Sequence, residues 1–210
     1  EVMAIGRTFA EALNKAMRGL ELKDLRLSES DRDLTHANPK RLFAVMDALR
    51  NGVVPSLIQQ QTGYDAWFVE QMRRIVEMEN ELAADALQTE HATLAIQQKL
   101  RKAKRMGISD ERIAQLTHRS ITEIRQLRLS LGIKANFYRV HTCAAEFEAH
   151  TPYMYSTYAT VDEAEVTGKP KVMILGGGPN RIGQGIEFDY CCVHACMALR
   201  DLGYETIMVN

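Results

Sequence analysis

Cysteine is scarce in this chain, with four residues among 210: Cys143, Cys191, Cys192 and Cys196. Two are adjacent and three fall within one helical stretch, which excludes a disulfide framework and fits a reduced, cytoplasmic protein. No apolar run approaches the roughly 20 residues needed to span a bilayer, and the first residues lack a signal-peptide pattern. The chain also lacks a marked excess of either charge, because its 26 Lys and Arg residues are balanced by 27 Asp and Glu residues. The chain as a whole is therefore not drawn to nucleic acid or to acidic membranes.

Signals for helix starts recur through the first part of the chain. Thr8 with Glu11 and Ser120 with Glu123 form capping boxes, in which hydroxyl and carboxylate satisfy the first free amides of a helix. Asn38–Pro39 is another start signal, because proline at the first helical position lacks only an amide that would be unsatisfied anyway. Short helices with one-sided apolar spacing predict a small all-α domain. The expected helices cover residues 8–20, 39–51, 55–62, 65–82, 93–106, 109–116 and 120–131, and the fourth carries Trp67, Phe68, Met72, Ile75 and Leu82.

The character of the chain changes after Gly132. Segments 136–142 and 153–158 are rich in aromatic and β-branched residues and are expected to be extended. An apolar run at 172–175, a glycine-rich loop, a helical pattern and a second apolar run at 206–209 then make the opening unit of a parallel α/β domain. Two strands cannot bury both faces of a sheet. We therefore expect both ends of the chain to be cuts in a longer enzyme.

The loop from Gly176 to Gly185 (GGGPNRIGQG) invites comparison with nucleotide-binding loops. Its glycines permit positive φ, and exposed amides at a helix start can hold an anion. The loop nevertheless fits neither standard fingerprint. Arg181 stands where G-x-G-x-x-G needs glycine, and Gln184–Gly185 replace the lysine and hydroxyl of the P-loop. Phosphate binding and a tight turn both stay open, and spacing does not decide whether Arg181 and Glu187 form a surface pair or line a polar passage.

Cysteine and histidine do not assemble a metal site or a nucleophile. Cys192 and Cys196 are four apart on a predicted helix, but His194 lies off their face and no second ligand pair stands at a useful distance. Small residues that pack a helix on a sheet are the better interpretation. His141 and Cys143 share a face of an extended segment, yet no third group that could orient them is recognisable. We expect no metal ligands, no cofactor-binding residues and no catalytic residues in this chain.

A basic stretch runs from Gln98 to Arg128, with nine basic residues against three acidic ones. The helices at 109–116 and 120–131 within it resemble a helix-turn-helix, whose second helix would enter the major groove of DNA while basic side chains hold phosphates. The alternative is a helical hairpin whose basic face is solvated or meets an acidic partner surface. The near-neutral charge of the whole chain favours the hairpin, and DNA binding is the second hypothesis.

Longer runs of specific residues resemble one family, the carbamoyl-phosphate synthase large subunit. Two runs resemble the opening of its second synthetase half, and two more match just upstream. A further pair resembles the end of its first half. The match is strong at both ends and rests on order and helical pattern in the middle. The runs are Gly176 to Ala195 and Gly203 to Asn210, then Thr142 to Phe147 and Tyr153 to Tyr158, and finally Glu1 to Arg7 with Ala16 to Glu21.

This resemblance implies an ATP-dependent ligase with two ATP-grasp halves joined by a helical oligomerisation domain. The first half would make carboxyphosphate from bicarbonate and ATP, and ammonia from a glutaminase small subunit would convert it to carbamate. The second half would phosphorylate carbamate with a second ATP, for pyrimidine and arginine biosynthesis. The parent enzyme would use ATP, Mg or Mn, and K, none of which is expected to bind this chain alone. The expected partners are the rest of the large subunit, the small subunit and further copies of the chain, without nucleic acid or membrane.

The resemblance also assigns the parts of a mainly α chain. Residues 1–20 would end the carboxyphosphate synthetic domain, and 21–165 would form the helical oligomerisation domain. Residues 166–210 would begin the carbamoyl phosphate synthetic domain with the first strand-loop-helix-strand unit of its pre-ATP-grasp, Rossmann-like fold. The family's catalytic residues lie elsewhere, so we expect an inactive fragment that links the two halves. Four residues match positions lining the passage for carbamate, where glycine keeps the bore open and fixed charges orient a small anion: Glu1, Arg181, Gly185 and Glu187.

Overall fold

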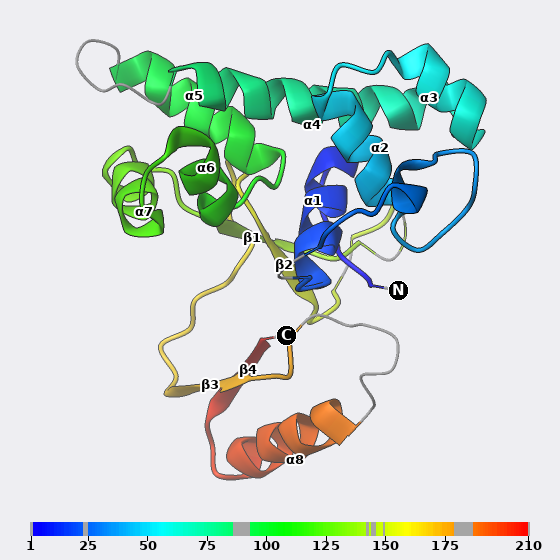
Figure 1. Ribbon diagram of the computed structural model, residues 1–210. Coiled ribbons are helices and arrows are strands. Elements are labelled where there is room, and N and C mark those ends of the chain that lie inside the picture. Colours follow the sequence, from blue (N-terminus) through cyan, green and yellow to red (C-terminus); the bar gives the residue numbers. More distant parts are fainter. Residues whose placement is uncertain are drawn as a thin grey trace. The chain divides into compact units, whose positions relative to one another are not determined.

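The computed structural model describes residues 2–22, 25–85, 93–141, 143, 146–148, 150–178 and 187–209. The chain forms two compact units, one from Thr8–Glu11 and Leu22–Lys134 and the other from Glu1–Arg7, Ala12–Glu21 and Ala135–Asn210. We call the first the helical unit and the second the flanking unit, because its segments flank the helical unit in the sequence. Over the described residues the fold is mainly α with short strands in two small sheets, which confirms the predicted fold class (Figure 1).

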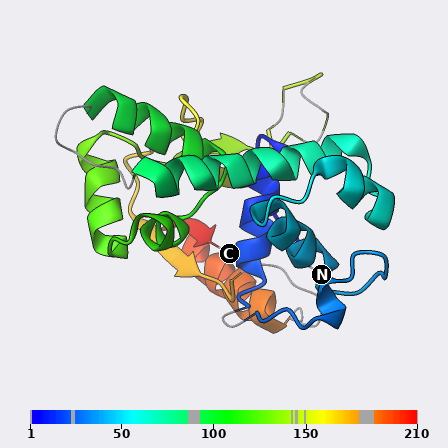
Figure 2. The same cartoon turned by 45° about the horizontal axis from the view of Figure 1, so that its top comes forward.

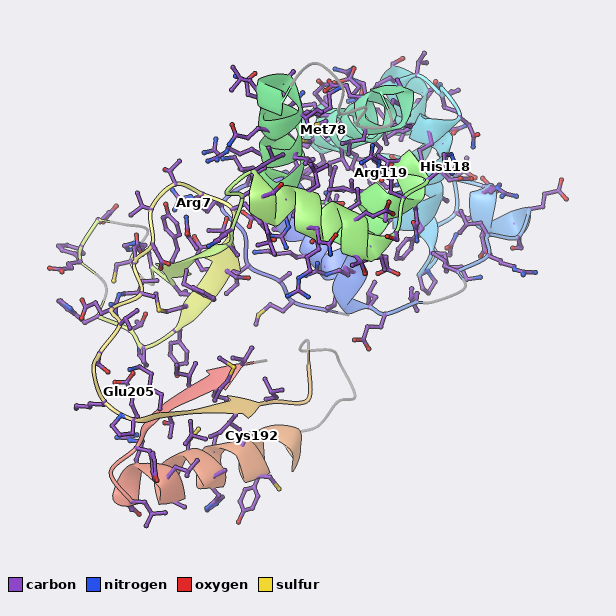
Figure 3. The ribbon with its side chains drawn as sticks, turned by 90° about the vertical axis from the view of Figure 1, so that its left-hand side faces the viewer. Arg7, Met78, His118, Arg119, Cys192 and Glu205 are labelled. Carbon is purple, nitrogen blue, oxygen red and sulfur yellow. The ribbon has the colours of Figure 1, made fainter. Side chains whose placement is uncertain are left out.

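The helical unit is organised around one long helix, α4 (Ala66–Asp85). This helix packs on α2 (Arg41–Arg50), α3 (Pro55–Thr62) and α6 (Asp110–Thr117), and α6 packs on α7 (Ile121–Ser130). The views of Figures 1 and 2 both show α5 (Thr93–Arg105) within the same group of helices. Met78 of α4, which is 1% exposed, lies among these helices in Figure 3. Fully buried side chains of this core include Ile58, Met72, Ile75, Met78, Leu82, Leu100, Ile113 and Ile124.

Local signals set the ends of these helices. Gly63 adopts the left-handed conformation (φ 70°) that ends α3, and His118 (Figure 3) does the same after α6 (φ 54°). The Ser109 hydroxyl caps α6 by accepting a hydrogen bond from the amide three residues further on. Ser120 and Glu123 complete the predicted capping box of α7, with both reciprocal bonds present. At these ends, nearby residues satisfy free backbone groups of the helices or give the chain the left-handed turn that stops them.

The start of α2 differs from the sequence expectation. The helix begins at Arg41 and not at Pro39. Asn38 is the reason, because its side-chain oxygen accepts a hydrogen bond from the Lys40 amide (2.8 Å) and its carbonyl accepts one from the Arg41 amide (3.1 Å). These two bonds make a turn, so the proline sits in that turn before the helix.

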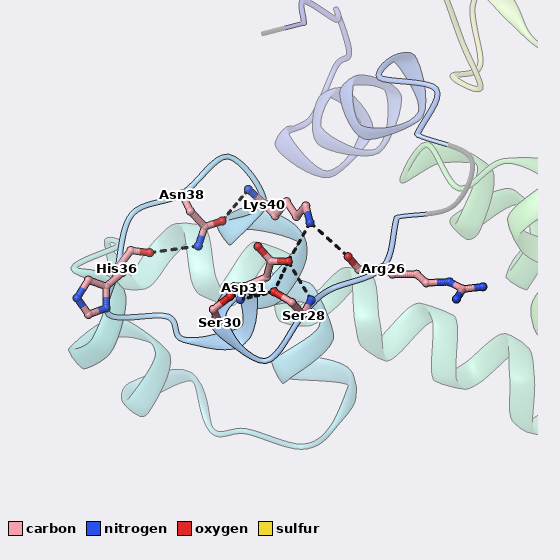
Figure 4. Close-up of polar contacts among 7 residues, drawn as sticks. All are labelled: Arg26, Ser28, Ser30, Asp31, His36, Asn38 and Lys40. Atoms are coloured by element: carbon pink, nitrogen blue, oxygen red, sulfur yellow. Dashed lines mark hydrogen bonds and ion pairs between the residues drawn. The ribbon is translucent and has the colours of Figure 1, made fainter.

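A polar network holds the loop that precedes α2 and contains the short 3-10 turn η1 (Ser30–Arg32) (Figure 4). Asp31 Oδ2 accepts hydrogen bonds from Lys40 Nζ (2.9 Å), the Ser28 amide (2.9 Å) and the Ser28 hydroxyl (2.8 Å). Lys40 Nζ also donates to the Arg26 carbonyl (3.4 Å). These contacts, the one from Lys40 foremost, lower the pKa of Asp31 to about 2. These polar bonds, together with the buried side chain of Leu34, set the course of this loop.

The first sheet of the flanking unit is a hairpin of β1 (Asn136–Arg139) and β2 (Met154–Thr157), paired antiparallel. Both strands lie in segments that the sequence predicts to be extended. The chain after β2 returns along the outer edge of β1: the Phe137 amide donates to Asp162 Oδ1 (3.3 Å) and the Arg139 amide to Glu163 Oε2 (2.7 Å). These carboxylates satisfy amides that would otherwise form an open sheet edge.

The second sheet pairs β3 (Lys171–Leu175) with β4 (Glu205–Val209) in parallel, and α8 (Glu187–Asp201) packs on both strands. This is the predicted strand-loop-helix-strand unit. Gly178 (φ 99°) and Gly203 (φ 89°) take positive φ on either side of α8, where other residues would be strained. Two parallel strands with a helix between them in the chain and packed on both are the opening elements of an α/β fold.

Candidate contact surfaces and their support

An aromatic surface lies at the start of α4. Asp65 Oδ1 accepts a hydrogen bond from the Trp67 amide (2.8 Å) and so fixes the first turn of the helix. On this turn the rings of Trp67 and Phe68 have centroids 5.1 Å apart in an edge-on arrangement. Phe9 of α1 (Phe9–Gly19) joins them, at 5.4 Å from Trp67 and 5.3 Å from Phe68. We call these three rings the aromatic surface.

Two rings of the aromatic surface, those of Trp67 and Phe68, are exposed although they belong to the apolar pattern of α4. Trp67 is 53% exposed and Phe68 is 44% exposed, whereas Met72 and Ile75 on the same helix are buried. Val54 and Leu57, next to and within α3, are exposed as well. Aromatic side chains are enriched at the buried centres of protein interfaces, where they supply large contact area at little entropic cost. The chemistry available here is therefore contact with another protein surface.

A first ion-pair network, further along α4 than the aromatic surface, ties three helices together. Glu79 of α4 accepts hydrogen bonds from Arg50 Nε of α2 (2.7 Å) and from Arg112 Nε of α6 (2.7 Å). The Glu79 side chain is 6% exposed, while the two arginines are about one-third exposed. Burial by itself would raise the pKa of Glu79, but the hydrogen bonds from Arg112 and Arg50 outweigh it and lower the pKa.

A second network holds α5, α6 and α7. Asp110, the first residue of α6, lies 2.7 Å from Lys104 Nζ and 3.0 Å from Arg128 Nη2. Both cations also donate to backbone carbonyls, Lys104 to Ile108 (2.9 Å) and Arg128 to Ile133 (2.9 Å). Burial opposes the charge of Asp110, yet the two cations lower its pKa. The three charges satisfy one another inside the unit, as buried charges must.

Acidification is expected to destabilise the helical unit through these two carboxyls. Each has a lowered pKa in the folded state, so the stabilisation is present above about pH 5 and is lost as the pH falls below about 4. Urea midpoints measured by circular dichroism between pH 7 and pH 3 should fall along this course. The double variant Glu79→Gln with Asp110→Asn should start lower and decline less steeply. Equal slopes for the variant and the parent chain would contradict the assignment.

The basic stretch found in the sequence is partly neutralised within the helical unit, where four of its nine basic residues form ion pairs. Three of its basic residues make the ion pairs above, and Lys102 Nζ lies 3.1 Å from Glu81 Oε1. Two of the carboxylates, Glu79 and Glu81, belong to α4 and so fell outside the window 98–128. The count of charges along the sequence therefore overstated the basic character of α6 and α7.

The predicted tunnel residues lie outside what the structure describes. Glu1, Arg181 and Gly185 are not among the described residues, and for Glu187 only its place as the first residue of α8 is described. Among the described residues no group of three or more metal-binding side chains gathers. Within the same ranges, no helix is long and apolar enough to cross a membrane.

The sheet of β3 and β4 leaves one of its faces open. Met173, Leu175, Ile207 and Val209 are 61%, 74%, 39% and 42% exposed. The alternate residues of both strands are less exposed, as expected if they face α8. In complete α/β domains, apolar sheet faces of this kind are covered by further elements.

Buried ion pairs, an exposed aromatic surface and a parallel strand-helix-strand unit describe a helical domain followed by the opening elements of an α/β fold. The comparisons agree. The family described as carbamoyl-phosphate synthetase large chain, oligomerisation domain, matches residues 1–132, and the carbamoyl phosphate synthase preATP-grasp domain matches residues 168–210. This chain belongs to the carbamoyl-phosphate synthetase large chain family.

Curated relatives match along the whole chain. The carbamoyl phosphate synthase large chain of Xanthomonas axonopodis pv. citri is 48% identical, and that of Archaeoglobus fulgidus 45%, each over all of this chain and 20% of the relative. The large chain of Methanothermobacter thermautotrophicus is 49% identical over all of this chain and 19% of its own length. This chain thus spans about a fifth of the relatives it matches. The comparisons confirm the family predicted from the sequence and give no support to the DNA-binding alternative.

Proposed function

We propose that the chain is the middle segment of a carbamoyl-phosphate synthase large chain. In this proposal residues 1–20 end the carboxyphosphate synthetic domain, 21–165 form the helical oligomerisation domain, and 166–210 begin the carbamoyl phosphate synthetic domain. The order of the two matched families, an oligomerisation domain at 1–132 and a preATP-grasp domain at 168–210, supports the order of the last two parts. The segment joins the two synthetase halves and is inactive by itself.

The parent protein would be the glutamine-hydrolysing, cytoplasmic enzyme. It would use bicarbonate, ammonia from a glutaminase small subunit and two ATP, with Mg or Mn and K, to supply pyrimidine and arginine biosynthesis. The identities of 45–49% to large chains of this synthase support the proposal. Within it, Glu1, Arg181, Gly185 and Glu187 would line the passage for carbamate, an assignment supported by their match to the family pattern.

The segment's own work in this proposal is self-association through the helical unit. The observation that carries it is the match of residues 1–132 to an oligomerisation domain. The aromatic surface supports it, because Trp67 and Phe68 are large, exposed side chains on a helix that is otherwise packed into the core of the helical unit. Burying such rings on contact would contribute roughly 25 cal/mol per Å² of apolar surface.

Sedimentation at increasing concentration should show a reversible rise in mass. Trp67 is the sole tryptophan of the chain, so its fluorescence reports on the aromatic surface. We expect its emission to move to shorter wavelength over the same concentrations. Phe68→Ala should weaken association about tenfold or more, because central aromatic residues dominate interface energies.

Phe137→Ala is the matched control, since Phe137 is equally exposed (45% against 44%) but lies on the hairpin of the flanking unit. It should associate as the parent chain does. A strictly monomeric chain would overturn the proposed self-association. Association without any change in Trp67 emission would instead place the contact on another face of the helical unit.

A further inference from the structure

Lys15 bonds to one chain segment that precedes the helical unit in the sequence and to one that follows it. Lys15 Nζ donates a hydrogen bond to the Ile5 carbonyl (2.9 Å) and another to the Ser156 carbonyl (2.6 Å). Ile5 precedes the helical unit, and Ser156 in β2 follows it, 141 residues after Lys15. All three residues belong to the flanking unit. Hydrogen bonds from a charged donor are shorter and stronger than neutral ones, so these two are more than incidental contacts.

Two aromatic rings of the hairpin add to this junction. The Lys15 ammonium lies 5.5 Å from the ring centroid of Tyr155, and the Arg7 guanidinium lies 4.3 Å from that of Tyr138. Figure 3 shows Arg7 beside the hairpin strands. The two rings are neighbours, with centroids 6.2 Å apart. Both distances from cation to ring fall within the range of a favourable cation–π interaction.

The hairpin side of the junction is itself held firmly. Tyr138 is buried (7% exposed), and its hydroxyl accepts a hydrogen bond from the Val161 amide (3.1 Å). The outer edge of β1 is covered by Asp162 and Glu163, as described above. A lysine anchored on this base therefore binds residues 2–7 to a rigid support, and the long aliphatic stem of lysine lets its ammonium reach both carbonyls.

We propose that Lys15 is a positioning residue that links residues 2–7 to the hairpin of β1 and β2, so that these two segments of the flanking unit move as one body. The inference rests on the proposed function, in which this chain joins two synthetase halves, and it assigns the route of that connection. The segment ending the first half is coupled to the segment leading into the second half directly through Lys15. The helical unit is an insert at this point, and its association state does not enter the coupling.

Hydrogen exchange of the whole chain, followed peptide by peptide, tests this route. In Lys15→Met the peptides covering residues 2–7 and 153–158 should both exchange about tenfold faster, since each loses a charge-assisted bond. Exchange in α4, α6 and α7 should stay as in the parent chain. Lys15→Arg, which keeps the charge and the donors, should restore most of the protection in both segments. Lys169→Met is the matched control, because Lys169 is an exposed lysine of the same unit.

Tyr155→Leu is a milder second variant, which removes the ring but neither carbonyl partner and should speed exchange in the same two segments by about threefold. Faster exchange in only one segment, no change in either, or a uniform rise along the chain would overturn the proposal. Sedimentation of the same samples separates this test from that of self-association. Lys15→Met should associate as the parent chain does. A variant that loses association, such as Phe68→Ala, should in turn keep the parent chain's exchange rates in residues 2–7 and 153–158.

Discussion

Asp110→Asn is expected to lower the free energy of unfolding of the helical unit by about 3–5 kcal/mol, the usual cost of breaking a buried ion pair on one side. Lys104 is 5% exposed and Arg128 is 11% exposed, so neither cation can recover its hydration when the carboxylate is gone. Asparagine keeps the shape and one acceptor oxygen, but it leaves two buried positive charges close together. The loss is therefore electrostatic rather than one of packing.

Glu111→Gln is the control for this prediction. It removes the same charge from the same first turn of α6, but Glu111 is exposed. Its cost should stay within about 1 kcal/mol, the contribution of a carboxylate to the helix dipole. Urea unfolding followed by circular dichroism measures both variants. Similar midpoints for the two would show that the second network contributes no more than a surface charge does.

Helix boundaries were largely predictable because their causes are local. Gly63, Ser109 and Ser120 act on amides or carbonyls a few residues away, so the sequence contains the whole interaction. The exception is instructive. Asn38 can cap a helix or form a turn before it, and both choices look alike in sequence. Its bonds to Lys40 and Arg41 chose the turn, which moved the start of α2 past the proline.

The ion-pair networks were not predictable, because their partners are distant in the sequence. Glu79 is 29 residues from Arg50 and 33 from Arg112. The basic stretch from Gln98 to Arg128 counted Arg112 toward a basic face, whereas the fold turns it toward Glu79 of α4. The pairing depends on how helices pack, and packing is decided by the whole core rather than by any single segment.

The aromatic surface illustrates the same limit for the candidate site. Trp67 and Phe68 extend the apolar pattern of α4, and periodicity alone places them on its buried face. The structure buries Val69, Met72 and Ile75 but leaves Trp67 and Phe68 about half exposed, with the Phe9 ring beside them. The family could nevertheless be recognised from the sequence, because long runs of specific residues identify relatives without any knowledge of packing.

Glu79→Gln is expected to cost about 2–3 kcal/mol, less than a fully buried pair would, because water can reach the freed guanidinium groups. Arg50 and Arg112 are 34% and 36% exposed, in contrast to the cations around Asp110. Glutamine can still accept one hydrogen bond, so what is lost is the charge and the second bond of the fork. The urea midpoint for unfolding of the helical unit, in which α2, α4 and α6 pack together, should then be lower than in the parent chain.

Glu77→Gln, two residues away on α4, provides the comparison. Glu77 is 50% exposed and pairs with Arg73, which also binds Glu70 through both its Nε and Nη2 atoms (2.8 Å each). An exposed pair of this kind contributes little to stability, so Glu77→Gln should unfold near the urea midpoint of the parent chain. A cycle that adds Arg112→Met to Glu79→Gln should show non-additivity of about 1–2 kcal/mol, since the double variant no longer carries an unpaired Arg112 charge. Strict additivity would mean that Arg112 and Glu79 stabilise the helical unit independently, and the network would then reduce to separate contacts.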